Sequence, residues 1–303
     1  MPQESSSAPR HISVLKEEVL QLLDPQPGQV IVDATLGVGG HGLAILKKLG
    51  ETGKLIGIDR DPEMLALAKR ELAGYPATFV HGNFENLPEI LEELQCGRVD
   101  AVIADLGFCS DQLAEPRRGL SFQQEGPLDM RLDPTRGDSA ADLVRRLQEK
   151  DLADIFWRFG EEHFSRRIAR KIVEARKVAP LTTTTELADL VRSCVPRQHG
   201  VRHPIDPATR VFQALRIAVN DELGALEQLL KILPDCLKPS GKAAIISFHS
   251  LEDRLVKRAF RERETFEEIT RKPRVAQEEE VRHNPRARSA KLRAAVLRLA
   301  ATR

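Results

Sequence analysis

The 303 residues of this chain contain no sequence pattern typical of a membrane protein, an exported protein or a cysteine-ligated metal site. No apolar run approaches membrane-spanning length, and the polar start Met1–Arg10 lacks the apolar core of an export signal. The cysteines form no Cys-x-x-Cys pair and have no nearby histidine pair at metal-ligand spacing; they are Cys96, Cys109, Cys194 and Cys236. We therefore expect a cytoplasmic protein without membrane contact, with reduced thiols and no bound metal.

The chain as a whole has no large excess of positive or negative residues, and its net charge is only +1. The distribution is uneven, because residues 271–303 hold ten Lys/Arg and three Glu, and the rest of the chain is net negative. Within this tail, residues 281–293 hold five cations and no acid. Such a cluster can neutralise phosphates, so we expect the tail to be a separate electrostatic part. The alternative is a solvated basic stretch with no ligand.

The most informative segment is a glycine turn that follows an apolar strand. The string Val30-Ile-Val-Asp33-Ala-Thr-Leu-Gly37-Val-Gly39-Gly40-His41 indicates a strand, a tight turn and the start of a helix. Glycines let the backbone turn sharply and lie directly against a ligand. Asp59 follows Gly39 by 20 residues, near the spacing at which nucleotide-binding α/β units place a carboxylate on a ribose diol. The pattern predicts a bound adenosine; the alternative is a connection that binds nothing.

The form of the turn narrows the choice of adenosine cofactor. A dinucleotide site favours Gly-x-Gly-x-x-Gly, whereas this turn has a Gly39-Gly40 doublet. A Gly-x-x-x-x-Gly-Lys-Ser/Thr loop does not occur, which disfavours a nucleoside triphosphate. With Asp33 before it, the turn suits S-adenosylmethionine, whose ammonium can meet a carboxylate and whose carboxylate can meet backbone N–H groups. An NAD-dependent oxidoreductase remains the alternative from another enzyme class.

The order of predicted elements favours a parallel α/β sheet with an interruption. Strands are predicted at 30–34, 54–59, 77–81 and 99–106, with helical patterns between them, and strands return at 243–248 and 294–299. A long helix is predicted at about 210–237, with possible breaks at Gly224 and Pro234, and Thr183 with Glu186 forms a predicted capping box. We expect a discontinuous sheet domain of residues 1–107 and 210–303, with residues 108–209 as a helical insertion.

Ligands of open α/β sheets gather beyond the carboxyl ends of the strands, where several polar side chains are expected. Asn83 and Phe84 follow the third predicted strand; Phe84 could stack on an adenine, although a lone Phe is more often core. Asp105 ends a very apolar strand, so it either faces a site or caps the next turn. Farther along, Ser250 with Asp253 forms a predicted capping box, which would leave His249 as a positioned neighbour.

Longer strings give the chain a resemblance to a known family. They are Asp33-Ala-Thr-Leu-Gly-Val-Gly-Gly-His41, Asp105-Leu-Gly107, Arg118-Gly-Leu-Ser-Phe122, Gly126-Pro-Leu-Asp-Met-Arg131, Ala208-Thr-Arg-Val-Phe-Gln-Ala214, Ser247-Phe-His-Ser-Leu-Glu-Asp253 and Asn284-Pro-Arg-Ala-Arg-Ser-Ala-Lys-Leu-Arg293. In unbroken order from about His11 to Arg293, they resemble the bacterial small-subunit ribosomal RNA cytosine-N4 methyltransferases, the MraW/RsmH family.

The resemblance implies a Rossmann-like class I S-adenosylmethionine-dependent methyltransferase sheet of α/β class, with an inserted helical domain that recognises substrate. It implies N4-methylation of a cytidine in 16S ribosomal RNA at the decoding site of the small ribosomal subunit. The implied cofactor residues are Gly39, Gly40, His41, Asp59, Phe84, Asp105 and Gln112, to which the turn itself adds Asp33 and Gly37.

For the reaction, Asp105 is the candidate that accepts the N–H groups of the attacking amine, although the Asp/Asn/Ser-Pro-Pro-aromatic string of many amino-methyltransferases is absent. The target base must leave its stack. The side chains expected to meet substrate RNA are Arg117, Arg118, Arg131, His249, Arg286, Arg288, Lys291 and Arg293. The oligomeric state stays open.

Two positions depart from the family pattern. Val38 stands where the family usually has Arg, and Phe108-Cys109 stand where it usually has Val-Ser. Cytosine C5 methyltransferases attack with a cysteine thiolate, but Ser at this position in the family makes Cys109 a small packing residue. A non-catalytic RNA-binding factor and a DNA amino-methyltransferase remain alternatives, which methyl incorporation into RNA, assembled subunits or duplex DNA would separate.

Overall fold

The computed structural model describes residues 12–196 and 206–298, and the predicted polar start Met1–Arg10 lies outside them. The chain divides into two units, which are described separately below. Unit 1 comprises Met1–Cys109 and Leu223–Arg303, and unit 2 comprises Ser110–Glu222.

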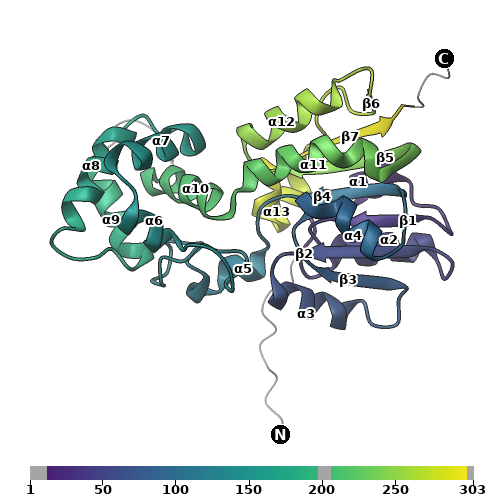
Figure 1. The fold of residues 1–303 in the computed structure, drawn as a ribbon, viewed down its shortest axis with the longest axis horizontal. Coiled ribbons are helices and arrows are strands. Elements are labelled where there is room, and N and C mark those ends of the chain that lie inside the picture. The colour runs from purple at the N-terminus through teal and green to yellow at the C-terminus, as the bar shows by residue number, and fades with distance from the viewer. Residues whose placement is uncertain (1–11, 197–205, 299–303) are drawn as a thin grey trace, which may run out of the picture. The chain divides into compact units, whose positions relative to one another are not determined.

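Unit 1 is built on a seven-stranded sheet in the order β3-β2-β1-β4-β5-β7-β6 (Figure 1). The first five strands in this order are parallel, and β7 runs antiparallel to its neighbours β5 and β6. This order confirms the predicted Rossmann-like class I sheet of a mixed α/β fold. The strands are β1 (Val30–Asp33), β2 (Lys54–Asp59), β3 (Ala77–His81), β4 (Val99–Asp105), β5 (Leu237–Ser247), β6 (Phe266–Glu268) and β7 (Lys291–Leu297).

Helices of unit 1 cover both faces of this sheet. Their bounds are α1 (Lys16–Leu23), α2 (Gly40–Leu49), α3 (Pro62–Glu71), α4 (Leu87–Glu93), α11 (Glu222–Cys236), α12 (Ser250–Phe260) and α13 (Glu278–His283), with the short 3₁₀ turns η1 (Phe84–Asn86) and η3 (Pro285–Ser289). The first residue of α11, Glu222, is the last residue of unit 2, and the rest of the helix belongs to unit 1.

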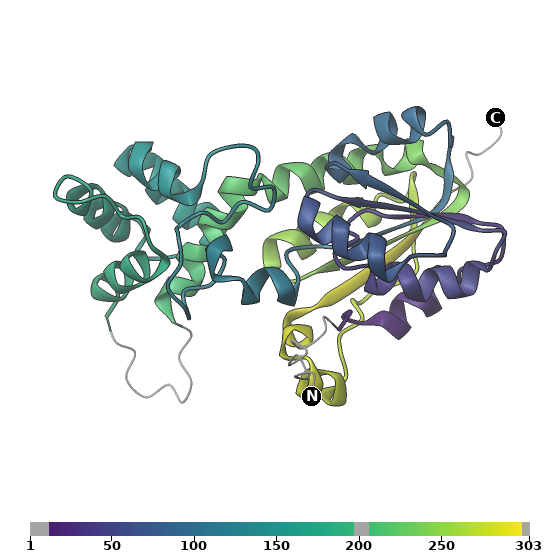
Figure 2. The ribbon, with the colours of Figure 1, turned by 90° about the horizontal axis from the view of Figure 1, so that it is seen from below.

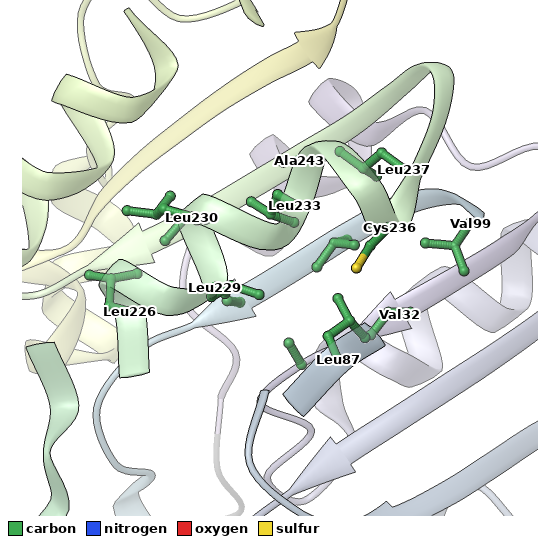
Figure 3. Close-up of a cluster of buried hydrophobic side chains, with 14 of the residues drawn as sticks. Val32, Leu87, Val99, Leu226, Leu229, Leu230, Leu233, Cys236, Leu237 and Ala243 are labelled. Atoms are coloured by element: carbon green, nitrogen blue, oxygen red, sulfur yellow. The ribbon is translucent and has the colours of Figure 1, made fainter. Parts of the chain in front are cut away.

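The core of unit 1 has two layers because successive strand side chains point to opposite faces. On β1, Val32 joins the cluster shown in Figure 3, which α4, α11 and α12 cover, and its neighbour Ile31 joins the cluster under α1, α2 and α3. On β4, Val102 likewise joins the first of these clusters and Ile103 joins the second. Both faces being apolar explains why the central strands are continuous hydrophobic runs.

Unit 2 is helical, as the sequence predicts. Its elements are α5 (Ser110–Ala114), η2 (Pro116–Arg118), α6 (Ala140–Arg146), α7 (Glu149–Gly160), α8 (Ser165–Ala175), α9 (Thr184–Cys194) and α10 (Pro207–Asn220). Helix α7 lies beside α8 and packs on α10 (Figures 1 and 2). The predicted capping box at Thr183 and Glu186 starts α9. Because α10 packs on α7, the second boundary follows Glu222 rather than the predicted residue 209.

The predicted helix of residues 210–237 is two helices, and the break differs from the prediction. Asp221 adopts a left-handed conformation with φ 46° between α10 and α11, so the chain turns there and not at Gly224. Pro234 lies inside α11 near its end. Among the described residues, none of these helices is long and apolar enough to cross a membrane.

The basic tail is not a separate part of the molecule. Its strand β7 lies inside the sheet, with Leu292 and Ala294 buried. Upstream of β7, Asn284 Nδ2 donates to the carbonyl of Ile12, and Glu280 accepts from the backbone N–H of Leu15. Apolar residues of the tail complete the core, and its basic residues range from the exposed Arg288 to the buried Arg293.

The cluster in Figure 3 makes a stability prediction. Leu229 on α11 is fully buried in it, so Leu229→Ala should lower the free energy of unfolding by about 3 kcal/mol, through lost burial and the cavity left behind. Urea denaturation checks this value, with the half-exposed Leu67→Ala as the matched control that should change stability little. Equal losses in the two variants would contradict this packing.

Candidate cofactor site at the strand ends

The turn between β1 and α2 is held in place by one carboxylate. Asp59, at the end of β2, accepts from the backbone N–H of Gly37 at 2.7 Å through Oδ2 and from that of Asp61 at 2.8 Å through Oδ1. Gly37 and Gly39 have φ of 54° and 90°, a conformation that residues with a Cβ rarely adopt. A carboxylate has about four acceptor positions, so Asp59 keeps capacity for two hydroxyl donors. Burial raises the pKa of Asp59 to about 6.

A second tie joins the ends of β1 and β4. The backbone N–H of Asp105 donates to Thr35 Oγ1 at 2.6 Å, and that of Ala34 donates to the carbonyl of Ile103 at 2.8 Å. Asp33 Oδ1 accepts from the backbone N–H of Thr35 at 3.3 Å. The side chains of Asp33 and Asp105 are thereby held at adjacent strand ends, as the sequence predicts.

Several buried polar atoms at this edge have no hydrogen-bond partner among the described residues. They are Asp33 Oδ2, Asp105 Oδ1, both ring nitrogens of His41, and Asn83 Oδ1. His41 Nε2 lies 3.6 Å from Asp105 Oδ2, which is an ion pair when the imidazole is protonated. Buried polar groups are normally satisfied, so this concentration of unsatisfied atoms at one edge indicates a polar ligand.

The charges of the cluster match the amino-acid end of S-adenosylmethionine. Burial raises the pKa of Asp33 to about 7, while His41 lowers it and the nearby Asp105 and Asp59 raise it. A bound ammonium would stabilise the Asp33 carboxylate, and Asp59 has acceptor capacity for ribose hydroxyls. The residues present therefore fit this cofactor.

The end of β3 contributes Asn83 and Phe84. Phe84 is half-buried and packs against the hydrophobic cluster of Val32 and its neighbours. It therefore belongs partly to the core, which was one of the two roles expected for it. Asn83 donates through Nδ2 to Glu85 at 2.8 Å and leaves its Oδ1 unsatisfied. The sequence predicts Asn83 together with Phe84 at this strand end, and the structure places Asn83 there, between β3 and η1.

Arg286 of the basic tail contacts the segment that follows Asp105. The Arg286 guanidinium lies 5.5 Å from the centre of the Phe108 ring and 5.6 Å from that of Phe248, and Nη2 donates to the carbonyl of Phe108. Cys109 is buried, with Sγ 3.3 Å from Met64 Sδ. This placement agrees with a packing role for Cys109.

Two residues expected to meet RNA, Arg293 and His249, have other contacts, which correct or qualify those expectations. Arg293 is only 5% exposed, and its guanidinium pairs with Asp253 at 2.7 Å, so it belongs to the fold rather than to an RNA surface. His249, not Ser250, is the N-cap of α12, because its side chain accepts from the Glu252 N–H, and Glu252 accepts from its N–H in return. Asp253 therefore does not complete the predicted capping box.

The remaining expected RNA contacts differ in exposure. In unit 1, Arg288 is exposed and Lys291 lies 3.7 Å from Asp253. In unit 2, Arg117 is exposed, whereas Arg131 forms a two-pronged pair with Asp129 at 2.7 and 2.8 Å. Arg118 is buried and donates to the carbonyl of Leu132, which corrects its expected role as a phosphate contact. Gln112 is buried on α5 of unit 2, and its part in cofactor binding stays a prediction.

Comparison with known proteins decides the family. The model of the MraW methylase family matches residues 8–298. The chain belongs to the MraW methylase family. Ribosomal RNA small subunit methyltransferase H of Sorangium cellulosum is 52% identical over 289 residues, which cover 94% of this chain and 90% of that protein. The protein of the same name from Gloeobacter violaceus is 51% identical over 288 residues, with 94% and 87% covered.

Solved structures resemble the MraW family chain more distantly. A ribosomal RNA methylase from Streptococcus thermophilus covers 94% of this chain and 94% of its own length, at 10% identity and a TM-score of 0.43. Family membership makes the chain a methyltransferase with S-adenosylmethionine as its cofactor, and the predicted enzyme class and cofactor are confirmed.

The buried Asp33 predicts a pH-dependent stability. Its pKa of about 7 lies above the ordinary 3.8, so between these values the native state holds a proton that the unfolded chain has lost. The contribution of Asp33 to the stability of the ligand-free protein therefore falls as pH rises through this window. Asp33→Asn stays neutral, so its melting temperature should exceed that of the unchanged protein increasingly from pH 5 to pH 8, as thermal melts at several pH values would measure.

The same substitution should weaken binding of the cofactor, because a neutral amide would replace the carboxylate that we expect to meet the ammonium. Calorimetric titration with S-adenosylmethionine at pH 8 measures this loss. An Asp33→Asn protein with unchanged affinity, or with a melting difference that does not depend on pH, would contradict the proposed charge of this site.

Proposed function

We propose that this enzyme transfers the methyl group of S-adenosylmethionine to N4 of a cytidine in 16S ribosomal RNA, at the decoding site of the small ribosomal subunit. The observation that carries the proposal is the buried cluster of Asp33, His41 and Asp105, whose unsatisfied atoms lie at the carboxyl ends of β1 and β4 and on α2. The names of the close relatives support the RNA substrate.

The residues of the turn bind and orient the cofactor. Asp59 accepts from the ribose hydroxyls while it still holds the Gly37 N–H, and the Asp33 carboxylate meets the ammonium. Phe84, Gly39 and Gly40 complete the proposed cofactor site, the glycines because their backbone can lie against it. When bound, S-adenosylmethionine supplies an electrophilic methyl group on a positively charged sulfur.

The main task at the acceptor is positioning. The N4 amine is a poor nucleophile because its lone pair is delocalised into the pyrimidine ring. We assign to Asp105 Oδ1, which is unsatisfied, the role of accepting an N4–H, so that the lone pair localises and points at the methyl group. The proton lost from N4 then has a carboxylate acceptor, beside which His41 lies at 3.6 Å.

Cytosine C5 chemistry is the second candidate, and the position of Cys109 argues against it. That mechanism needs an accessible thiolate, whereas Cys109 is buried with its sulfur against Met64. A C5 reaction would also leave the unsatisfied carboxylate of Asp105 without a role.

The RNA must present the base out of its stack, so the substrate is single-stranded or locally open. We propose that unit 2 recognises this RNA and that the exposed cations Arg117 and Arg288 meet phosphates, which predicts binding that weakens with added salt. We propose that the enzyme acts in the cytoplasm, with the small ribosomal subunit as its partner, because its relatives are named for this substrate.

The role of Asp105 makes a direct prediction. Asp105→Asn keeps the shape of the side chain but loses the charge and one acceptor, so the rate of methyl transfer should fall by about 10²–10⁴-fold. Single-turnover transfer of labelled methyl groups to small subunits that lack the modification measures the rate, and nucleoside mass spectrometry identifies the product.

The matched control is Asp100→Asn, on the same strand but at its opposite end, where Asp100 pairs with Lys238. Its methyl transfer rate should be near normal. Near-normal transfer by Asp105→Asn with unchanged cofactor affinity would remove Asp105 from the mechanism, and methylated C5 as the product would replace the proposed reaction.

A further inference from the structure

The only tryptophan of the chain is exposed on unit 2, at the start of a stretch of sequence rich in cations. Trp157, on α7, is 54% exposed, and its ring meets that of His163 edge to face, with centroids 5.7 Å apart. The next residue, Phe164, is 38% exposed and precedes α8 directly. Large aromatic side chains are normally buried in a helical domain, so an exposed pair beside a histidine ring needs an explanation.

The local fold explains why these rings are at the surface. On α7, Phe156 and Leu152 face inward and are fully buried, which leaves the next position on the opposite side of the helix. Glu162, between α7 and α8, is buried and accepts from the backbone N–H of Phe164 at 2.8 Å. The connection that presents His163 and Phe164 is therefore fixed by a hydrogen bond.

Most charged residues that follow Trp157 along the chain as far as residue 171 are cations. Residues 157–171 include five Lys/Arg and two Glu, one of which is the buried Glu162. Arg166 and Arg167 are exposed in the first turn of α8, and neither forms an ion pair with any residue in the described ranges 12–196 and 206–298. Arg158 follows Trp157 and lies over the Phe159 ring at 5.5 Å.

We propose that Trp157, His163 and Phe164, with Arg158, Arg166 and Arg167, form a platform that binds single-stranded RNA. Bases stack on the aromatic rings, and the arginines meet the phosphates on either side. Exposed aromatic rings among cations are the arrangement that binds single strands, because every base has a face that can stack. This inference rests on the proposed function and deepens it by naming where unit 2 holds the substrate.

An acidic peptide would use the arginines, but it would leave the exposed rings without a matching partner. An apolar protein surface would cover the rings and leave Arg166 and Arg167 without counter-charges. Single-stranded RNA satisfies both kinds of side chain at once.

The solitary tryptophan provides a direct readout. Titration of the full-length protein with a single-stranded oligoribonucleotide of the small-subunit RNA should quench Trp157 emission in step with binding measured by fluorescence anisotropy of a labelled oligonucleotide. S-adenosylhomocysteine alone should leave the emission unchanged. Binding without any change in emission, or no binding, overturns the platform.

Substitutions test the contribution of each part. Trp157→Ala should weaken binding of the oligonucleotide by about tenfold, and Trp157→Phe should restore most of it, because a ring remains to stack. The control is Val178→Ala, another exposed apolar side chain of unit 2 at 91% exposure, which should bind normally. Unchanged thermal melts establish that each variant is folded.

The charged part is tested by salt. Arg166→Gln with Arg167→Gln should reduce the slope of log affinity against log salt by roughly 0.7 per charge removed, whereas Arg145→Gln, whose arginine already pairs with Asp142, should leave the slope unchanged. Equal slopes in all variants overturn the role of the arginines.

The two proposals fail in different ways. Trp157→Ala protein that binds RNA and methylates small subunits normally overturns the platform and leaves the proposed function intact. Intact protein whose Trp157 emission responds to RNA, but which transfers no methyl group to RNA or subunits, overturns the proposed function and supports the platform. An emission change with RNA-free ribosomal proteins but not with RNA assigns the surface to a protein partner and overturns the inference.

Discussion

The proposed cofactor site depends on the two hydrogen bonds that the Asp59 carboxylate accepts from the backbone of Gly37 and Asp61. These bonds hold the glycine turn against the end of β2 and leave the carboxylate with acceptor capacity for the ribose that we propose it binds. The arrangement has a cost, because burial disfavours the charged forms of Asp59 and Asp33 and raises their pKa values to about 6 and about 7. Buried carboxylates of this kind lower the stability of the ligand-free protein. Binding of a positively charged or hydroxyl-bearing ligand would restore part of that stability.

Much of this site was predictable because its signals are local. A strand, a glycine turn and a carboxylate at fixed spacing are determined by neighbouring residues, so the sequence indicates Gly37, Asp59 and Asp105 correctly as residues of three strand ends. The parallel sheet follows from the alternation of apolar strands with helices. The second domain boundary was missed because the pattern does not reveal which unit α10 packs against.

The remaining errors concern side chains whose role depends on distant partners. In the sequence, Arg293 does not differ from the other cations of the basic tail. In the structure it lies on β7 within the sheet, and its guanidinium is 2.7 Å from Asp253. His249 replaces Ser250 as the helix cap, since the first helical residue is decided by how β5 ends. The exposure of a side chain also depends on distant parts of the chain, which is why the sequence did not indicate that Trp157 would be 54% exposed.

A crystal structure of the enzyme with S-adenosylhomocysteine would show whether Asp59 binds the ribose. The measurement is the pair of distances from the Asp59 carboxylate oxygens to the two ribose hydroxyls. We expect both hydroxyls to lie within about 2.5–3.2 Å of this carboxylate while the Gly37 N–H still donates to it. A ribose bound elsewhere, or an Asp59 side chain released from Gly37 in the complex, would show that Asp59 does not hold the turn and the ribose together.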